Sequence, residues 1–309
     1  MDCGTNTIRL LVADIDAAAG TQDSLVREMR IVRLGQGVDR TGMLADEALT
    51  RVFAAADEYA ALIEPYGVEA LRFVATSAAR DAGNAEVFTE GIRARLGVPP
   101  EVVSGAEEAQ LSYDGATRSL VTAGHVVPSP IAVLDIGGGS TELILGDSHG
   151  HVRAAHSLDI GSVRVTERLM PSDPPTADEV QAATRVVDEA LDTLPSWGVH
   201  PDVVRTLVGV AGTVTTVGTL LLGLDHWDRQ QVHHASFPAA DVHALTEWLL
   251  AATVADRQAR GVPRGRSDVI GAGALILDRV LRRSDAERLL VSDSDILDGI
   301  AWALAAAHR

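Results

Sequence analysis

The stretch LDIGGGSTELIL, from Leu134 to Leu145, places an aspartate before three glycines, followed by hydroxyl residues, a glutamate and an apolar run. A fainter copy, MDCGTNTIRLLV, occupies Met1 to Val12. Alignment of the two copies pairs Asp2 with Asp135, Gly4 with Gly137, Thr7 with Ser140, Leu10 with Leu143 and Asp14 with Asp147. This internal repeat indicates two similar halves.

Each copy has the composition of a phosphate-binding turn. A glycine turn between two strands can bring backbone N–H groups close to a phosphate, because no Cβ blocks the approach. An aspartate at the start of such a turn suits a hard cation that bridges to phosphate oxygens. The repeat therefore raises the hypothesis that two turns face each other across one polyphosphate or nucleotide.

Length and composition indicate an ordinary globular protein. The chain has 309 residues, of which 46% are hydrophobic, enough for two domains with buried cores. Its single cysteine, Cys3, excludes a disulfide within the chain and fits a reducing cytosol. No cationic segment followed by an apolar one opens the sequence, so we expect no secretion signal and a cytoplasmic location.

The charge balance restricts the chemistry. A net charge of −17 repels polyanions at long range and argues against general nucleic-acid binding. All 26 basic residues are arginine, which excludes Walker-type phosphate loops, Schiff-base chemistry and lysine general bases. A phosphate ligand must therefore be held by backbone amides, arginine side chains and metal.

Apolar runs rich in β-branched residues alternate with helical patterns, which indicates an α/β fold. In the first half the pattern predicts strands over Asp2–Asp14, Val26–Leu34, Ala70–Ala75 and Glu101–Val103, and helices over Asp46–Glu64, Asn84–Leu96 and Gly105–Leu120. In the second half it predicts strands over Ile131–Asp135, Thr141–Leu145, Val152–Ser157 and Arg288–Val291, and helices over Val163–Met170, Ala177–Leu194, Ala239–Ala252, Ser267–Arg283 and Ile296–Ala307.

The stretch VTAGHVVPSP, Val121 to Pro130, is the expected domain boundary, because it is short and carries two prolines. We expect residues 1–124, with the C-terminal helix at about 296–309, to form one domain, and residues 125–295 to form the other. Two α/β halves that each open with an aspartate–glycine hairpin are typical of the duplicated actin-like (ribonuclease H-like) fold, with the active-site cleft between the domains.

One uncharged window, TLVGVAGTVTTVGTLLLGL from Thr206 to Leu224, approaches the roughly 20 residues of a membrane span. It contains five threonines and four glycines, and VAGT interrupts it. We therefore interpret it as a buried strand, a glycine turn and a buried helix, without a membrane segment.

Several stretches together resemble the exopolyphosphatase/guanosine pentaphosphate phosphatase family. They are DCGTNTIRLLV, ATSAARDAGN, SGAEEAQLSYDGA, LDIGGGSTEL, GVAGTVTTVG, RSDVIGAGALIL and VSDSDILDGI, in this order. The resemblance covers nearly the whole chain and implies a two-domain actin-fold hydrolase. Such enzymes remove terminal phosphate from inorganic polyphosphate or from guanosine pentaphosphate (pppGpp), with magnesium. The chain resembles the short form, without the additional C-terminal helical domain of longer members.

The resemblance also implies site residues. Amides of Gly4, Thr5, Asn6, Thr7, Gly137, Gly138, Gly139, Ser140, Gly212 and Thr213 would hold phosphate oxygens, with Arg80, Asn84 and Arg266 as side-chain contacts. Asp135 and Glu142 would hold Mg²⁺ or another divalent cation such as Mn²⁺, with Asp2 nearby. For Arg80, pairing with Asp81 is the structural alternative, and Arg266 and Arg9 are alternatively surface ion pairs.

The stretch SGAEEA contains two adjacent acids that point about 100° apart on a helix. Ser104 is a natural N-cap, and Glu107 three residues later completes a capping box. That leaves Glu108, which matches the family's catalytic base, to face the cleft and activate water.

The sequence thus predicts a Mg²⁺-dependent exopolyphosphatase, with pppGpp 5′-phosphatase as the nearest alternative. An actin-fold kinase and a non-catalytic polyphosphate or nucleotide sensor are further alternatives. The expected partners are the substrate and, as an open alternative, a second copy in a homodimer. Because family members carry apolar residues before the first aspartate, whereas Asp2 follows Met1 here, we also expect that the true start lies upstream.

Overall fold

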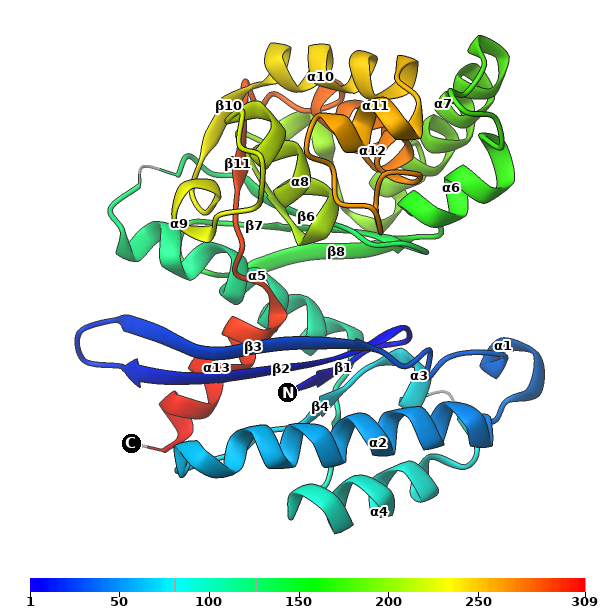
Figure 1. Cartoon of the computed structure of the whole chain (residues 1–309). Coiled ribbons are helices and arrows are strands. Elements are labelled where there is room, and N and C mark those ends of the chain that lie inside the picture. The colour runs from blue at the N-terminus through cyan, green and yellow to red at the C-terminus, as the bar shows by residue number, and fades with distance from the viewer. Residues whose placement is uncertain (81, 126, 309) are drawn as a thin grey trace. The chain divides into compact units, whose positions relative to one another are not determined.

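The computed structural model describes residues 1–80, 82–125 and 127–308, and these pack as two compact units. Unit 1 contains Met1–Gly115 and Ile296–Arg309, and unit 2 contains Ala116–Asp295. Each unit is built on one β-sheet with helices packed against it (Figure 1). The chain passes from unit 1 to unit 2 within helix α5 (Gly105–Thr122) and returns after Asp295.

The sheet of unit 1 has the strand order β3-β2-β1-β4-β5. Its strands are β1 (Asp2–Cys3), β2 (Thr7–Asp16), β3 (Thr21–Ile31), β4 (Val74–Ala75) and β5 (Glu101–Val102). The first three are antiparallel neighbours, whereas β4 runs parallel to β1 and β5 parallel to β4. Besides α5, the helices of this unit are α1 (Val38–Thr41), α2 (Asp46–Ile63), α3 (Ser77–Arg80), α4 (Ala85–Leu96) and α13 (Ile296–Ala307), with a 3₁₀ turn at Glu64–Tyr66.

Alternation along the strands sends side chains to two faces of this sheet. Ile8 and Leu10 of β2 are fully buried in a core formed with α2 and α4. Val74 of β4 instead joins a smaller cluster with Leu111 of α5 and Ile300 of α13. Helices therefore pack against both faces of the unit 1 sheet.

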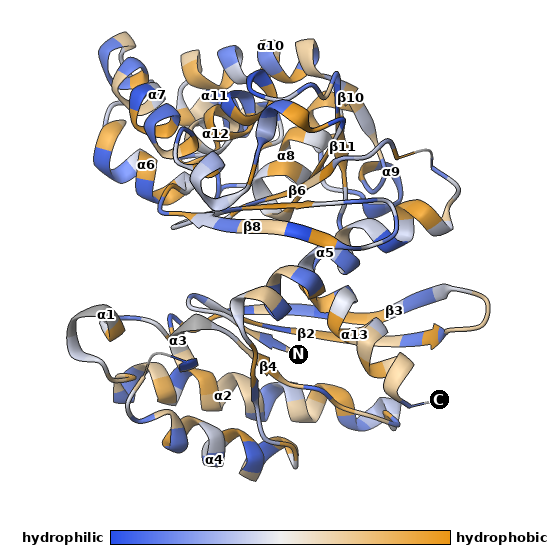
Figure 2. Cartoon of the chain, turned by 180° about the vertical axis from the view of Figure 1, so that it is seen from behind, coloured by the Kyte–Doolittle hydropathy of each residue, from blue (hydrophilic) through white to orange (hydrophobic). Residues whose placement is uncertain are grey.

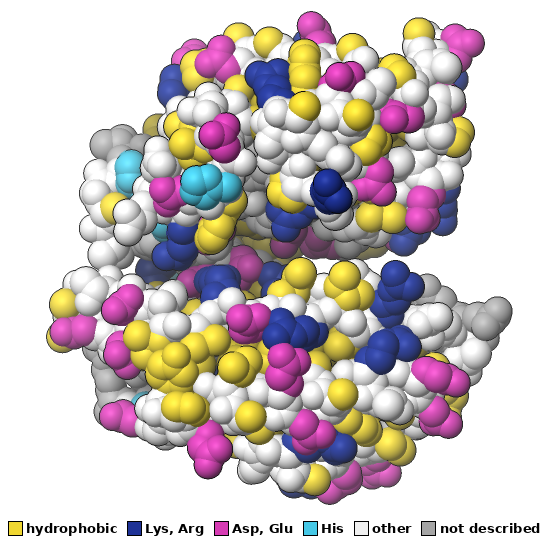
Figure 3. Space-filling model, in the orientation of Figure 1, with side chains coloured by type: hydrophobic (Ala, Val, Ile, Leu, Met, Phe, Trp, Pro, Cys, Tyr) yellow, Lys and Arg dark blue, Asp and Glu magenta, His cyan; other side chains and the backbone are white. Residues whose placement is uncertain are grey.

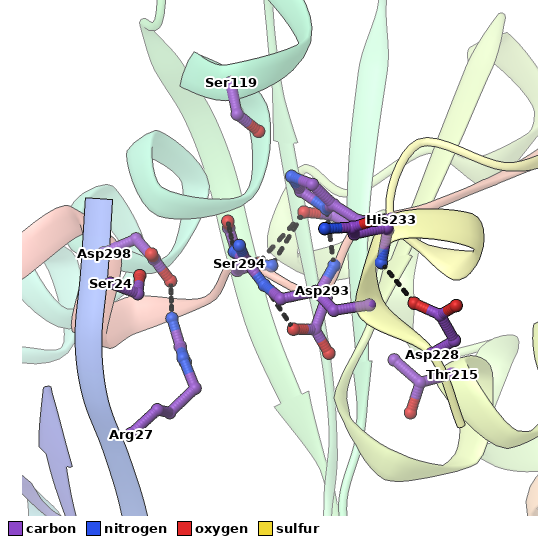
Figure 4. Close-up of polar contacts among 12 residues, drawn as sticks. Ser24, Arg27, Ser119, Thr215, Asp228, His233, Asp293, Ser294 and Asp298 are labelled. Atoms are coloured by element: carbon purple, nitrogen blue, oxygen red, sulfur yellow. Dashed lines mark hydrogen bonds and ion pairs between the residues drawn. The ribbon is translucent and has the colours of Figure 1, made fainter. Parts of the chain in front are cut away.

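The C-terminal helix α13 is anchored to the β2–β3 hairpin by a buried carboxylate. Asp298 is 2% exposed, and it accepts a hydrogen bond from Gln22 Nε2 at 2.6 Å. It also accepts a hydrogen bond from the Arg27 guanidinium (Figure 4). One residue later, a Cβ on Gly299 would lie 1.9 Å from the carbonyl oxygen of Leu111. The last helix thus packs against unit 1 so closely that only glycine fits.

The sheet of unit 2 has the order β10-β11-β9-β6-β7-β8. Its strands are β6 (Ile131–Ile136), β7 (Thr141–Gly146), β8 (Val152–Leu158), β9 (Thr206–Val210), β10 (Ser236–Pro238) and β11 (Arg288–Val291). β6, β9 and β11 are parallel, and the others pair antiparallel with their neighbours. Its helices are α6 (Ser162–Leu169), α7 (Ala177–Leu191), α8 (Ala211–Leu221), α9 (Arg229–Val232), α10 (Ala239–Ala251), α11 (Val254–Ala259) and α12 (Ile270–Arg282), with 3₁₀ turns at Leu194–Trp197 and Pro201–Val203.

One large apolar core holds unit 2 together. It joins Leu134 of the central strand β6 to Val214 of α8 and Leu277 of α12. β6 and much of α8 are coloured as hydrophobic in Figure 2, as expected for elements buried inside a layered α/β unit. A local cluster ties the end of β11 to α9, because Arg229 pairs with Asp293 at 2.9 Å and His233 Nδ1 accepts from the Asp293 amide at 3.0 Å (Figure 4).

The expected α/β architecture is confirmed, including the strand and helix of the uncharged window, which are β9 and α8. Among the described residues, no helix is both long and apolar enough to span a bilayer. The strand expected over Asp2–Asp14 is interrupted by the glycine turn, and the short elements β10 and α11 were not anticipated. Boundaries elsewhere differ by a few residues, because helix ends and strand ends fray.

Candidate functional site

The β6–β7 hairpin of unit 2 positions two carboxylates side by side. The Gly137 amide donates to the Ser140 carbonyl at 3.0 Å and closes the glycine turn. The register that follows places Asp135 of β6 directly opposite Glu142 of β7. Opposed residues in an antiparallel pair project to the same face with Cβ atoms about 5 Å apart.

This acidic pair is half-buried, on the sheet face opposite the main core. Ser157 lies opposite Glu142 on β8 and donates its hydroxyl hydrogen to Glu142 Oε1 at 2.6 Å. Like charges directly opposite each other are destabilising, and a bound cation would relieve that repulsion. The hydroxyl of Ser157 fixes the orientation of the Glu142 carboxylate.

Helix α6 holds the carbonyl groups of the glycine turn. The Gly137 carbonyl accepts from the Ser162 amide at 2.9 Å, and the Gly138 carbonyl accepts from the Val163 and Arg164 amides at 3.0 Å. In a planar trans peptide the N–H points opposite to the C=O. The amides of Gly138 and Gly139 therefore point away from α6, as an anion-binding turn requires.

A glycine outside the quoted motifs makes this contact possible. A Cβ on Gly161, the residue before α6, would lie 2.5 Å from the carbonyl carbon of Gly138. Backbone atoms cannot yield cheaply to such an overlap, so α6 approaches the turn because residue 161 has no side chain. Gly161 thus allows α6 to pack directly against the glycine turn.

A second backbone turn lies beside the first, between β9 and α8. Val210, the last residue of β9, pairs with Asp135. Ala211 then adopts φ of 64°, a left-handed conformation that is rare for a residue with a side chain and marks a strained turn. Gly212 follows in the first turn of α8, where helix amides favour an anion.

Arg266 lies directly over this turn. A Cβ on Gly212 would be 2.4 Å from the Arg266 guanidinium carbon, and Arg266 Nη1 donates to the Gly212 carbonyl at 2.9 Å. Desolvation lowers the pKa of Arg266, but a guanidinium remains charged at neutral pH. Thr213 is buried, and its hydroxyl donates to the Ile136 carbonyl at 3.5 Å, so its side chain stabilises the turn.

The hairpin of unit 1 has the same backbone design. Gly4 donates to the Thr7 carbonyl at 2.9 Å, the equivalent of the bond between Gly137 and Ser140. The carbonyls of its central residues are again held by backbone amides of a neighbouring segment: Asn6 accepts from Val32 and Arg33, and Thr5 accepts from Gly35, all at 2.9 Å.

The side chains of this hairpin differ. Asp2 pairs in register with Arg9 on β2, and Arg9 Nε lies 3.4 Å from Asp2 Oδ2. Asp2 is 3% exposed, so Arg9 compensates a buried charge. The contact gives Arg9 a structural role, and the assignment of Asp2 to a metal remains a prediction.

Arg80 and Asn84 of unit 1 make contacts with the backbone. Arg80 Nη1 donates to the Val103 carbonyl at 2.5 Å, immediately before the segment that carries Glu108. Asn84 uses both atoms of its side-chain amide on Leu44, accepting from its N–H at 2.8 Å and donating to its carbonyl at 3.0 Å. A phosphate contact by Asn84 would compete with these two hydrogen bonds to the Leu44 backbone, and that contact remains a prediction. Asp81, the alternative partner of Arg80, lies outside the described residues.

The two adjacent glutamates at the start of α5 are placed differently. Ser104 Oγ accepts from the Glu107 amide at 3.2 Å, as an N-cap does. The Glu107 carboxylate accepts from Arg72 Nη2 at 3.1 Å, a contact that the capping-box prediction did not foresee. Glu107 is exposed, whereas Glu108 is half-buried.

The donor set of unit 2 fits a hard divalent cation. Mg²⁺ is usually held by one or two carboxylates together with water and substrate phosphates. The opposed pair Asp135 and Glu142 supplies two carboxylates beside two backbone turns. Among the described residues there is no cluster of three or more His, Cys, Asp or Glu that would form an all-protein metal cage.

On the face drawn in Figure 3, arginine and acidic side chains are interspersed over the surface.

The sequence analysis did not identify Ser157, Gly161 or Arg164 as site residues. Their segment, HSLDIGSVR from His156 to Arg164, contains a glycine before a helical pattern, and the strand register would have placed Ser157 beside Glu142. No local motif marks Arg164.

A doubled aspartate–glycine hairpin on two α/β sheets defines a phosphate-binding protein of the duplicated actin-like type. Residues 11–307 match the model of the Ppx/GppA phosphatase family, and the chain belongs to this family. It is 45% identical to exopolyphosphatase 2 of Mycobacterium tuberculosis, covering 99% of this chain and 97% of that protein. It is 27% identical to the guanosine-5′-triphosphate,3′-diphosphate pyrophosphatase of Vibrio vulnificus, covering 100% of this chain and 59% of the longer relative.

Solved structures agree with the fold. The Ppx/GppA phosphatase of Aquifex aeolicus superposes with a TM-score of 0.85 at 30% identity, over 98% of this chain and 97% of that one. A crystal structure described as an exopolyphosphatase-like protein gives a TM-score of 0.81 at 41% identity, over 98% and 95% of the two chains. The resemblance seen in the sequence motifs is therefore confirmed across the whole chain.

Proposed function

We propose that the protein is a Mg²⁺-dependent exopolyphosphatase that releases terminal orthophosphate from inorganic polyphosphate in the cytoplasm. The observation that carries the proposal is the opposed pair Asp135 and Glu142 next to glycine-turn amides that point away from α6. The full-length similarity to a protein named exopolyphosphatase 2 supports the choice of substrate.

Unit 2 would bind the substrate and the metal. In this proposal Asp135 and Glu142 hold Mg²⁺, the amides of Gly138 and Gly139 bind phosphate oxygens, and Arg266 adds a positive charge. When bound, the metal would neutralise charge on the phosphate oxygens. These interactions stabilise the additional charge of the transition state without any lysine, which the chain lacks.

Water activation is assigned to Glu108 of unit 1. Its carboxylate would accept a proton from water while the water oxygen forms a bond to the terminal phosphorus. The bond from that phosphorus to the bridging oxygen breaks, and the shortened polyphosphate leaves with the electron pair. We do not assign this role to Glu107, because its carboxylate is exposed and bound to Arg72.

Phosphate release tests the proposal directly. The purified protein is incubated with long polyphosphate, tripolyphosphate, pppGpp or ATP, each with Mg²⁺ and with EDTA. We expect the highest kcat/KM on long polyphosphate and no release in EDTA. Preference for pppGpp would instead identify a pppGpp 5′-phosphatase, the activity named for the more distant relatives. Phosphate transfer to an acceptor other than water would identify a kinase, and binding without turnover would identify a sensor.

For the association state of the protein, monomer and homodimer are the two alternatives. Light scattering coupled to size-exclusion chromatography, with and without polyphosphate, decides between the two. A mass of one or two chains of 32.5 kDa is the expected result.

A further inference from the structure

Arg164 lies at the glycine turn but belongs to none of the motifs described above. It is the third residue of α6, and its amide donates to the Gly138 carbonyl at 3.0 Å, so its backbone is fixed against the turn. Its side chain returns toward the same place. Arg164 Nη2 is 3.6 Å from the position that a Cβ on Gly139 would occupy.

The charge of Arg164 is only weakly compensated by its neighbour Asp159. Arg164 Nη1 lies 3.6 Å from Asp159 Oδ1, longer than a hydrogen bond, and the Asp159 side chain is 92% exposed. Water and salt screen such a contact, and exposed pairs of this kind contribute little energy. A guanidinium offers five N–H donors in a planar fork, so Arg164 retains donors for a phosphate.

The position of Arg164 complements that of Arg266. Strand β6 lies between β7 and β9 in the sheet. Arg164 lies over the turn that joins β6 to β7, whereas Arg266 lies over the turn after β9. The two guanidinium groups therefore belong to turns on either side of the strand that carries Asp135.

We propose that Arg164 is a phosphate-binding residue that contacts a non-terminal phosphate of a polyphosphate chain, and so determines affinity for chain-like substrates. The inference rests on the proposed function, because it uses the same turn. A terminal phosphate held near Asp135 leaves the following phosphate of the chain as the next anion to be neutralised. Arg164 is the cation that unit 2 places at the glycine turn for this purpose.

The test compares Arg164→Gln and Arg164→Lys with Arg168→Gln. Arg168 is an exposed arginine one turn further along α6, so its substitution removes the same charge from the same helix. Binding of tripolyphosphate is measured by calorimetry without turnover, and kcat and KM are measured separately on long polyphosphate. Thermal unfolding monitors folding of each variant.

We expect Arg164→Gln to weaken tripolyphosphate binding and raise KM about tenfold or more, with kcat changed less than about threefold, as for loss of one charged contact. Arg164→Lys should recover part of the affinity, because the charge remains but the planar fork is lost. Arg168→Gln should behave as wild type.

Equal binding by Arg164→Gln and Arg168→Gln would overturn the inference. If Arg164→Gln fails to fold, Arg164→Lys decides: wild-type affinity contradicts a bidentate contact, and reduced affinity supports it. The proposed function fails separately. If the wild-type protein hydrolyses none of the substrates, exopolyphosphatase activity is refuted. If tripolyphosphate binding is nevertheless lost in Arg164→Gln, the phosphate-binding role of Arg164 is still supported.

Discussion

The two glycine hairpins share one backbone design but differ in the residue opposite the aspartate. In unit 1, Asp2 faces Arg9 across the strands, and the two charges compensate each other at 3.4 Å. In unit 2, the equivalent Asp135 faces Glu142. The closing bond of the turn is the same in both, at 2.9 Å and 3.0 Å.

The backbone of the hairpin is thus repeated without the charge of the residue opposite the aspartate. In the first hairpin, Arg9 supplies a positive charge beside the buried Asp2 carboxylate. In the second hairpin, the half-buried carboxylates of Asp135 and Glu142 are opposed, and a bound cation would relieve their repulsion. We therefore propose that the metal binds to unit 2 and that unit 1 supplies backbone amides and the base Glu108.

The largest expected effect concerns that base. Glu108→Gln should reduce kcat by about 10²–10⁴-fold, the usual contribution of a positioned general base, without loss of stability. Its control is Glu107→Gln, which keeps an acceptor for Arg72 and should retain nearly full activity. Turnover and thermal unfolding are measured for both. If Glu107→Gln is inactive and Glu108→Gln is active, the roles of the two residues are reversed. The general base is then Glu107, on the other side of α5.

The support of the second hairpin by α6 gives the next largest effect. Gly161→Ala should cost about 1–3 kcal/mol and weaken phosphate binding, because the new Cβ overlaps the backbone of Gly138. Gly265→Ala, where nothing lies within 4 Å of the new atom, is the matched control. Denaturant unfolding and tripolyphosphate titration provide the two readings. Wild-type stability of Gly161→Ala would mean that α6 does not hold the turn.

The smallest expected effect concerns the ion pair of the first hairpin. Arg9→Gln should lower stability by about 1–2 kcal/mol, because it removes a charge that compensates buried Asp2. The Mg²⁺ concentration for half-maximal activity should stay within about twofold, since the change acts on stability rather than on the metal. Urea unfolding and a Mg²⁺ titration measure the two quantities. A large change in the Mg²⁺ concentration required for activity would support a role of Asp2 in metal binding.

Much of this fold could be predicted because local patterns and the repeat agree. Asp2 pairs with Arg9 in the first hairpin, and Asp135 pairs with Glu142 in the second. The number of residues that separates Asp2 from Asp135 in the sequence also separates Arg9 from Glu142. A strand pairing that follows a tight turn is fixed by that turn, so the sequence contains it. The glycine turns and the paired carboxylates were accessible for this reason.

Contacts between distant segments were not accessible in the same way. Asn84 reads as a phosphate contact in its motif, yet its side chain is bound to Leu44, forty residues earlier. Ser104 caps the Glu107 amide as the local spacing predicts, but the Glu107 carboxylate is bound to Arg72, which lies 35 residues earlier. Arg164 lies beside the glycine turn only because α6 packs against that turn. Each depends on packing between elements, which periodicity does not encode.

We propose that Glu142, opposite Asp135, makes unit 2 the metal-binding half. A Mn²⁺ titration in the presence of tripolyphosphate, monitored by electron paramagnetic resonance, tests this proposal with wild type, Glu142→Gln and Asp23→Asn. Asp23 also lies opposite a carboxylate, Asp14, but both residues are exposed. We predict about tenfold or greater loss of Mn²⁺ affinity in Glu142→Gln and none in Asp23→Asn. Unchanged Mn²⁺ affinity in Glu142→Gln would contradict metal binding by the Asp135–Glu142 pair.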